Sequence, residues 1–212
     1  MSHEKPQQTA GWKRDELSRR TKRAADADRR WGPDTAVPDF SQAGQTAAFY
    51  EALAELESIC GSKSEPAQLK GLFTLQNTAR KEDVDGLQPK FMAKECFVFN
   101  HIRLDRTQVA VLPTRDRYEA IAAMQTHGSN FGVGPGGVID WIRELDRDEP
   151  LTLTGIGANF IEGFFLSAVK NPAKLAEKLI DICPDIVEQG SRDVEGLARE
   201  MKTSRRLLFW WD

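Results

Sequence analysis

Three segments of this chain combine residue types that can take part in binding or catalysis. The first is Trp210-Trp211-Asp212, where two indoles stand beside the Asp212 carboxyl group and the C-terminal carboxylate. The second is Cys183-Pro184-Asp185, which Gln189 follows within one helical turn. The third is the glycine-rich segment 132–137, which Asn130 precedes. Indoles anchor interfaces, thiolates and carboxylates do nucleophilic and acid–base chemistry, and glycine-rich turns bind phosphate, so the three segments point to different chemistries.

The glycine-rich segment matches the dinucleotide-binding pattern G-x-G-x-x-G and precedes a predicted helix. That pattern binds phosphate when a strand comes immediately before it, whereas here a predicted helix does. Pro135 also removes one of the N–H donors that would face a phosphate. We therefore interpret the segment as an interhelical loop, in which Ser129 and Asn130 beside the helix N-terminus could hold an anion.

Cys183 has two alternative interpretations. A nucleophilic cysteine needs a helix N-terminus and a base, and the available bases are His101 and His127 from elsewhere in the chain. A buried thiol on a helix face needs neither, and free cysteine is commonly buried. The sequence favours the buried thiol, and we assign no catalytic residue.

Acidic side chains gather near two helix ends, at Asp146, Asp148 and Glu149 and again at Asp185 and Glu188. Paired carboxylates can do acid–base work, but acidic helix ends are more commonly solvated. The histidines and cysteines show no H-x₃-H or C-x₂-C spacing, so we predict no metal site and no cofactor.

The composition indicates a soluble cytoplasmic protein. Of the 212 residues, 40% are hydrophobic and 29% charged, and the mean hydropathy is -0.48. No apolar run approaches the ~18 residues needed to span a bilayer, and the N-terminus has no apolar signal segment. The three cysteines are widely spaced and are expected to be reduced thiols. The net charge of -3 conceals a basic arm over residues 1–38 and an acidic remainder.

The hydrophobic pattern predicts the elements that must position these residues. The apolar run that ends at Trp211 would expose a large patch in water, so it predicts a terminal β-strand in the middle or near the edge of a sheet. Helices are predicted over residues 42–60 (capped by Ser41 and stopped by Gly61), 67–80, 115–127 (capped by Thr114), 138–149, 173–182 (after Pro172) and 194–202 (capped by Asp193). Strands are predicted over residues 96–99, 108–112, 151–154 and 160–166, the last two as a hairpin, with a polar loop at 81–86.

This order of elements predicts an α+β fold, in which helices pack on one face of a mainly antiparallel sheet and the last strand lies at the C-terminus. Three regions are expected. Residues 1–38 form a flexible charged arm, residues 39–106 an N-terminal region of helices and strands, and residues 107–212 a C-terminal α+β domain.

Five stretches of the C-terminal half carry a resemblance to a known family. They are Leu112-Pro113-Thr114-Arg115-Asp116-Arg117-Tyr118-Glu119-Ala120, Gly128-Ser129-Asn130-Phe131, Leu153-Thr154-Gly155-Ile156-Gly157, Cys183-Pro184-Asp185-Ile186-Val187-Glu188-Gln189-Gly190 and Phe209-Trp210-Trp211-Asp212. Together they resemble the bacterial "domain of unknown function 4253" family, whose members typically end in a Trp-Trp-Asp tail preceded by a Cys-Pro-Asp…Gln-Gly segment. One departure is Asn159, where the resemblance leads us to expect an acidic residue. The resemblance implies a compact α+β domain, of a kind that often serves as a partner-binding or toxin-neutralising module.

The leading hypothesis is a cytoplasmic, non-catalytic protein-binding module, such as an immunity protein that neutralises a bacterial toxin. The acidic body suits a basic partner surface, and tryptophans are frequent interface anchors. The candidate binding residues are Asn130, Trp141, Asp185, Gln189, Trp210, Trp211 and Asp212.

Two alternatives stay open. The first is a small-molecule sensor or enzyme that combines Asn130 and Cys183 with the Asp185/Gln189 and Trp210-Trp211-Asp212 segments. The second is nucleic-acid binding through the basic residues of segment 12–30. No membrane partner is expected.

Overall fold

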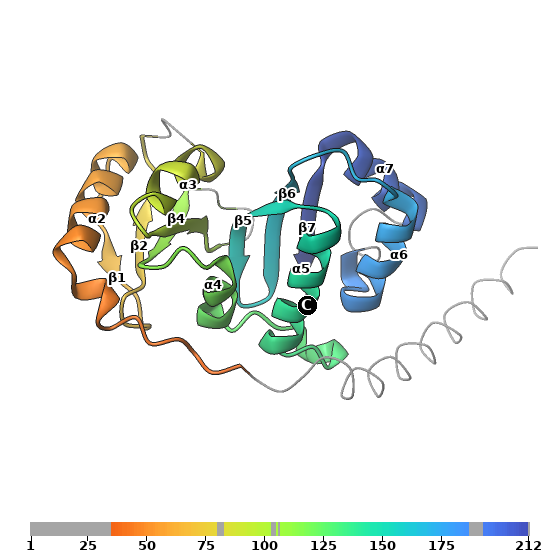
Figure 1. Cartoon of the computed structure of the whole chain (residues 1–212), viewed down its shortest axis with the longest axis horizontal. Helices are drawn as coiled ribbons and strands as arrows, with labels where there is room; N and C mark the ends of the chain where they lie inside the picture. Colours follow the sequence, from red (N-terminus) through yellow and green to blue (C-terminus); the bar gives the residue numbers. More distant parts are fainter. Residues whose placement is uncertain (1–34, 80–82, 103–104, 106, 187–192, 212) are drawn as a thin grey trace, which may run out of the picture.

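One mixed seven-stranded sheet organises the protein, with strand order β1-β2-β4-β3-β5-β6-β7. The structure, a computed structural model shown in Figure 1, describes residues 35–79, 83–102, 105, 107–186 and 193–211. The strands are β1 (Glu65–Pro66), β2 (Phe73–Gln76), β3 (Phe97–Asn100), β4 (Gln108–Leu112), β5 (Leu151–Gly157), β6 (Phe160–Phe165) and β7 (Arg206–Trp210). The helices are η1 (Ala43–Gln45), α2 (Ala47–Cys60), α3 (Val84–Met92), α4 (Arg117–Met124), η2 (Ser129–Phe131), α5 (Pro135–Asp148), α6 (Pro172–Ile182) and α7 (Val194–Ser204).

Neighbouring strands are antiparallel except at the junction of β3 and β5, which is parallel. The predicted hairpin of β5 and β6 is confirmed, and so are the predicted strands at β3 and β4. The terminal strand is also confirmed, because β7 pairs with β6 along its length and occupies the edge of the sheet. An α+β fold with a mainly antiparallel sheet is therefore what the sequence encodes.

The helix boundaries follow local capping chemistry. Gly61 adopts the left-handed conformation (φ 72°) at the end of α2, and the Asp193 side chain accepts the Gly196 N–H at the start of α7, both as predicted. Two predicted caps are displaced. Thr46, not Ser41, caps α2, and Asp116, not Thr114, caps α4. In each case a later side-chain oxygen reaches an unpaired N–H of the first turn.

Helices cover both faces of the sheet. Phe97 and Phe99 of β3 belong to the larger apolar core, whereas Val98 between them belongs to a second core under α2 and α3. Successive side chains of a strand point to opposite faces, so the two cores lie on opposite sides of the sheet. The single helical layer predicted from the sequence is therefore not what the structure shows. Figure 1 places α2 and α3 at one end of the sheet and α6 and α7 beyond β7 at the other.

The predicted helix over residues 67–80 is wrong. That stretch contains β2, and Gly71 adopts a φ of 86° between β1 and β2. The predicted polar loop at 81–86 is also partly wrong, because α3 begins at Val84. Leu69, Leu72 and Phe73 happen to recur at helical spacing, although a turn separates them.

The sheet continues across the predicted boundary between residues 106 and 107. β3 lies on one side of that boundary and β4 on the other, and the two strands are paired from Phe97↔Leu112 to Asn100↔Val109. Most of the predicted arm, residues 1–34, lies outside the described residues. Its last residues, 35–38, have no regular secondary structure, and the Gln125 side chain donates to the Thr35 carbonyl.

Acid should weaken the packing of α2 through Glu57. Its carboxylate bonds to the Lys63 ammonium (2.7 Å) and to the Ser64 N–H and hydroxyl, which lowers the pKa of Glu57 from 4.5 to about 2. Since the folded-state pKa lies below the ordinary value, Glu57 stabilises the fold above about pH 4.5 and this contribution is lost as the pH falls toward 2. Urea unfolding at several pH values should show a shallower acid loss for Glu57→Gln. The matched variant Glu51→Gln, on the exposed side of the same helix, should follow the wild type.

Candidate functional site

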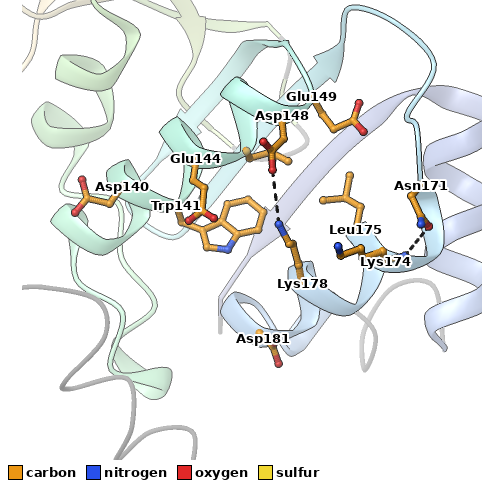
Figure 2. A pocket seen from close by; sticks show the side chains of 11 residues that line it. Asp140, Trp141, Glu144, Asp148, Glu149, Asn171, Lys174, Leu175, Lys178 and Asp181 are labelled. Carbon is orange, nitrogen blue, oxygen red and sulfur yellow. Dashed lines mark hydrogen bonds and ion pairs between the residues drawn. The ribbon is translucent and has the colours of Figure 1, made fainter.

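A groove of about 420 Å³ separates α5 from α6 and is the candidate binding site. Trp141 and Leu145 of α5 and Leu175 of α6 supply its apolar lining. Figure 2 shows the Trp141 indole extending from α5 toward α6. These three side chains are each only 6–7% exposed, so the floor presents a small apolar surface at the base of the groove.

Charged side chains line the groove, and acids outnumber bases. Five carboxylates (Asp140, Glu144, Asp148, Glu149 and Asp181) and two ammonium groups (Lys174 and Lys178) take part. The Lys178 ammonium pairs with Asp148 at 3.8 Å across the groove, and Figure 2 shows this contact linking the two helices. The remaining acids give the rim a negative potential, which favours a cationic ligand.

The helices that form the groove are fixed by the core beneath them. Trp141 meets Phe209 of the terminal strand edge to face, with ring centroids 5.2 Å apart. Asn171 caps α6 by accepting the Lys174 N–H, and Pro172 occupies the first turn as predicted. The groove is therefore bounded by two well-anchored helices and not by loops, which favours a preformed site.

Asp146 has a structural role in place of the acid–base role considered from the sequence. Its carboxylate accepts from the Leu151 N–H (3.0 Å), the Tyr118 hydroxyl (3.1 Å) and the Arg117 guanidinium. These bonds tie the end of α5 to α4 and to the start of β5. Asp148 and Glu149, the other two acids of that helix end, line the groove.

The two C-terminal indoles lie in the core. Trp210 and Trp211 are buried, and the Trp211 ring stacks on Phe209 with centroids 5.8 Å apart. The Trp211 indole N–H donates to the Ile182 carbonyl at 2.9 Å. Neither indole lines the α5–α6 groove, so of the three tryptophans proposed as anchors Trp141 is the one that does, with only 7% of its surface exposed.

Of the residues considered for a sensor or enzyme site, Cys183 lies against the terminal strand. Cys183 is buried and its thiol donates to the Trp210 carbonyl at 3.0 Å, as the inert interpretation predicts. Asp185, two residues after Cys183 in the sequence, is also buried, and Asn130 lies on η2. Gln189 and Asp212 fall outside the described residues.

The two described histidines are held by backbone carbonyls. His101 Nδ1 lies 3.2 Å from the Gln108 carbonyl and His127 Nδ1 lies 2.7 Å from the Gln125 carbonyl. Burial lowers the pKa of His101. Within the part of the chain that the structure describes, no three His, Cys, Asp or Glu side chains are grouped to hold a metal ion. Among the same residues, no helix combines the length and apolar character needed to cross a bilayer.

Three segments that are distant in the sequence converge on Trp211, directly after the terminal strand. Trp211 packs against Gly128, bonds to Ile182 just before Cys183, and exchanges backbone and side-chain bonds with Asn159. The Asn159 amide donates to the Trp211 carbonyl at 2.9 Å, a bond that an ionised acid could not donate. The segments around Gly128, Asn159 and Cys183 therefore pack with Trp211 into one end of the sheet.

Residues 108–212 match a family model. The family is described as Domain of unknown function (DUF4253). The DUF4253 match begins at β4 and includes the groove and the motifs that meet at Trp211, whereas β1–β3, α2 and α3 precede it. No curated protein and no solved structure matches the chain.

Gly128 should tolerate no side chain in this DUF4253 region. A Cβ at this position would lie 2.5 Å from the Trp211 ring, a distance that real Cβ atoms essentially never show. We expect Gly128→Ala to lower the free energy of unfolding by about 2 kcal/mol, because the buried indole has little room to move. Thermal or urea unfolding measures this. Gly86→Ala, at an exposed position of α3, should be neutral or stabilising, and equal losses in the two variants would contradict the close-approach argument.

Proposed function

We propose that the protein is a non-catalytic protein-binding module that receives a basic segment of a partner in the α5–α6 groove. The observation that carries the proposal is an aromatic and aliphatic floor bordered by five carboxylates and two ammonium groups. Lysine and arginine side chains of a partner would meet the carboxylates, while apolar residues beside them would cover Trp141. Charge complementarity sets the orientation and speeds association, and the desolvated apolar centre contributes most of the affinity.

The geometry favours a protein ligand over a small anionic ligand. Phosphate or carboxylate groups would stand among the acidic side chains of the rim, where the potential is unfavourable. Asp140 and Glu144 lie on the exposed side of α5, next to the floor, and so are accessible to a large partner. Figure 2 shows both carboxylates on the α5 side of the groove.

A narrower form of this proposal is an immunity protein that neutralises a bacterial toxin in the cytoplasm. Toxins that act on nucleic acids need basic surfaces, and an acidic groove can mask such a surface. The resemblance to a DUF4253 domain is compatible with this form and does not select it.

A charge reversal tests the groove. We expect Asp140→Lys/Glu144→Lys to weaken partner binding by about tenfold or more, because two attractive contacts become repulsive. The matched control Glu51→Lys/Glu195→Lys changes the net charge equally at exposed positions outside the groove. Each full-length variant serves as bait in host lysate, and captured proteins are quantified by mass spectrometry at low salt and at about 0.5 M salt.

The proposal requires one stoichiometric protein that the wild type and the control retain and the groove variant loses. Equal capture by the groove variant would place the interface elsewhere. For the narrower form, co-expression with the captured protein should restore growth when that protein is toxic. Growth that is equally poor with and without the wild-type chain would exclude an immunity role.

A further inference from the structure

The first described residues of the chain lead to the α5–α6 groove. Phe40 is buried in the larger core, and the Gln125 side chain donates to the Thr35 carbonyl at 3.1 Å, so both ends of residues 35–40 are anchored. Figure 1 shows this segment, in orange, running from η1 past α4 toward α5. Thr35 and Asp140 line the same hollow between α4 and α5, and Asp140 also lines the groove. The chain before Thr35 therefore joins the described structure beside α5, next to the groove.

The sequence that precedes this anchor is basic. Residues 19–30, the basic segment, contain six arginine or lysine residues and two aspartates, a net charge of +4. The groove lining carries five carboxylates and two ammonium groups, a net charge of -3. Opposite charges on a groove and on a segment tethered beside it favour their association.

The tether is long enough for this contact. A helix with its side chains is about 10–12 Å across. The chain from Arg30 to Thr35 spans up to about 17 Å when extended, so the basic segment can pass around α5 to the groove. A short tether also holds its segment at an effective concentration in the millimolar range, so a weak contact is enough to keep the groove occupied.

Two carboxylates of α5 are accessible to such a segment. Asp140 and Glu144 are both exposed and lie about one helical turn apart on the groove side of α5. Asp140 contacts Arg143 at 3.9 Å, but exposed pairs of this kind contribute little and yield to a competing cation. Arginine suits these acids, because its guanidinium binds a carboxylate through two parallel hydrogen bonds.

We propose that the basic segment binds in the α5–α6 groove of its own chain, with Arg29 and Arg30 against the carboxylates of Asp140 and Glu144. It thereby competes with a partner for these carboxylates and acts as an autoinhibitor. This regulatory role rests on the proposed function, whereas the contact within the chain does not. A basic segment that fills the groove about 90% of the time leaves about one-tenth of the molecules open, which lowers the affinity for a partner about tenfold.

Paramagnetic relaxation in the full-length chain, with no partner present, tests the contact. A nitroxide is attached at Ala25→Cys, and the three native cysteines are buried and so protected from the label. We expect the amide signals of Glu144 and Lys178 to broaden several-fold more at low salt than at about 0.5 M salt. The amides of α2 should be unaffected. Broadening that is absent, or that does not change with salt, would overturn the proposal.

Charge reversal in the groove separates binding from proximity, because the tether alone brings the label near α5. In the labelled chain, Asp140→Lys/Glu144→Lys should remove most of the broadening at Lys178. The matched control Glu51→Lys/Glu195→Lys makes the same change in net charge at exposed positions outside the groove and should keep the broadening. Equal broadening at Lys178 in the two variants would show proximity without binding and would contradict the proposal.

Charge reversal in the basic segment tests the same contact without altering the groove. Arg29→Glu/Arg30→Glu should lose the broadening at Lys178, whereas the control Lys13→Glu/Arg14→Glu, outside residues 19–30, should retain it. This pair keeps the test decisive even if a groove variant fails to fold. Retention of the broadening in Arg29→Glu/Arg30→Glu would exclude these two arginines as the ligands.

Partner capture tests the regulatory role. Arg29→Glu/Arg30→Glu should capture several-fold more of a groove-dependent partner than the wild type, because its groove is open. Equal capture by the two chains would exclude autoinhibition. The two proposals fail separately: without a partner the proposed function fails while the broadening persists, and without salt-sensitive broadening this inference fails while partner capture persists.

Discussion

Replacing Trp211 by alanine should lower the free energy of unfolding by about 4 kcal/mol, since removing a fully packed Trp costs about 3–5 kcal/mol. Trp211 is only 3% exposed and packs between the Phe209 ring and Gly128. Its indole N–H bonds to the Ile182 carbonyl, so the alanine variant also leaves a buried acceptor without its donor. Urea unfolding at neutral pH, followed by circular dichroism, measures the loss.

Two further variants show how much of this loss comes from the buried ring and its hydrogen bond. Trp211→Phe keeps an aromatic ring but removes the donor, and should fall between the wild type and the alanine variant. Tyr50→Ala removes an aromatic ring that is 49% exposed on α2 and should cost less than about 1 kcal/mol. If Trp211→Ala were no more destabilising than Tyr50→Ala, the C-terminal strand would not be an integral part of the core.

The sequence predicted the C-terminal half better than the N-terminal half, for a physical reason. The elements from β4 to β7 carry strong local signals: proline at the start of α6, an aspartate cap on α7 and an apolar run at β7. The N-terminal strands β1 and β2 are short, with β1 spanning Glu65–Pro66. Strands of that length have too few residues to display an alternating pattern, and they form because β4 offers a paired edge.

The two-sided sheet could have been predicted from β3 and β4. Cys96-Phe97-Val98-Phe99 and Val109-Ala110-Val111-Leu112 are unbroken apolar runs, and every one of these residues is buried. An unbroken run indicates a strand buried on both faces, whereas a one-sided sheet needs alternation. α3 was harder to predict, because Gly86 and Pro89 lie within it and lower its helix propensity.

The groove could not be predicted from the sequence, because its two walls come from helices that are far apart along the chain. Trp141 and the acids of segment 146–149 were candidates from the sequence, but the opposing wall on α6 was not. Two strands separate α5 from α6 along the chain, so the pairing of Asp148 with Lys178 has no local signature. The burial of Trp210 and Trp211 also depends on tertiary contacts. Trp141 of α5 packs on Phe209 of β7, and the end of α6 bonds to Trp211 through Ile182 and to Trp210 through Cys183.

Replacing Gln88 by leucine should lower the free energy of unfolding by about 3 kcal/mol, because it leaves buried acceptors unpaired at the junction of β3 and β5. Gln88 of α3 is buried, and its amide donates to the Val98 carbonyl of β3 (2.9 Å) and to the Leu153 carbonyl of β5. Its own oxygen accepts from the Thr152 hydroxyl at 3.0 Å. One side chain thus bonds to both strands.

The junction needs this side chain because its backbone pairing is minimal. β3 and β5 share the single register pair Asn100↔Gly155, and the register of β5 against β6 shifts between Leu153 and Gly155. Side-chain amides therefore supplement the backbone ladder: Gln88 acts at one end, and Asn100 donates to the Thr154 carbonyl at 3.1 Å near the other. Leucine fills the volume of Gln88 without supplying either bond, so the loss reports on hydrogen bonding and not on a cavity.

Hydrogen exchange locates the effect. In Gln88→Leu, amides of β3 and β5 should exchange faster, while amides of the β6–β7 pair should change less, because the loss arises at the junction of the two halves of the sheet. Gln45→Leu, at an exposed position of η1, is the matched control and should leave both stability and exchange near wild-type values. A uniform increase in exchange across all strands would instead indicate global destabilisation without local uncoupling. It would argue that the β3–β5 junction is no weaker than the rest of the sheet.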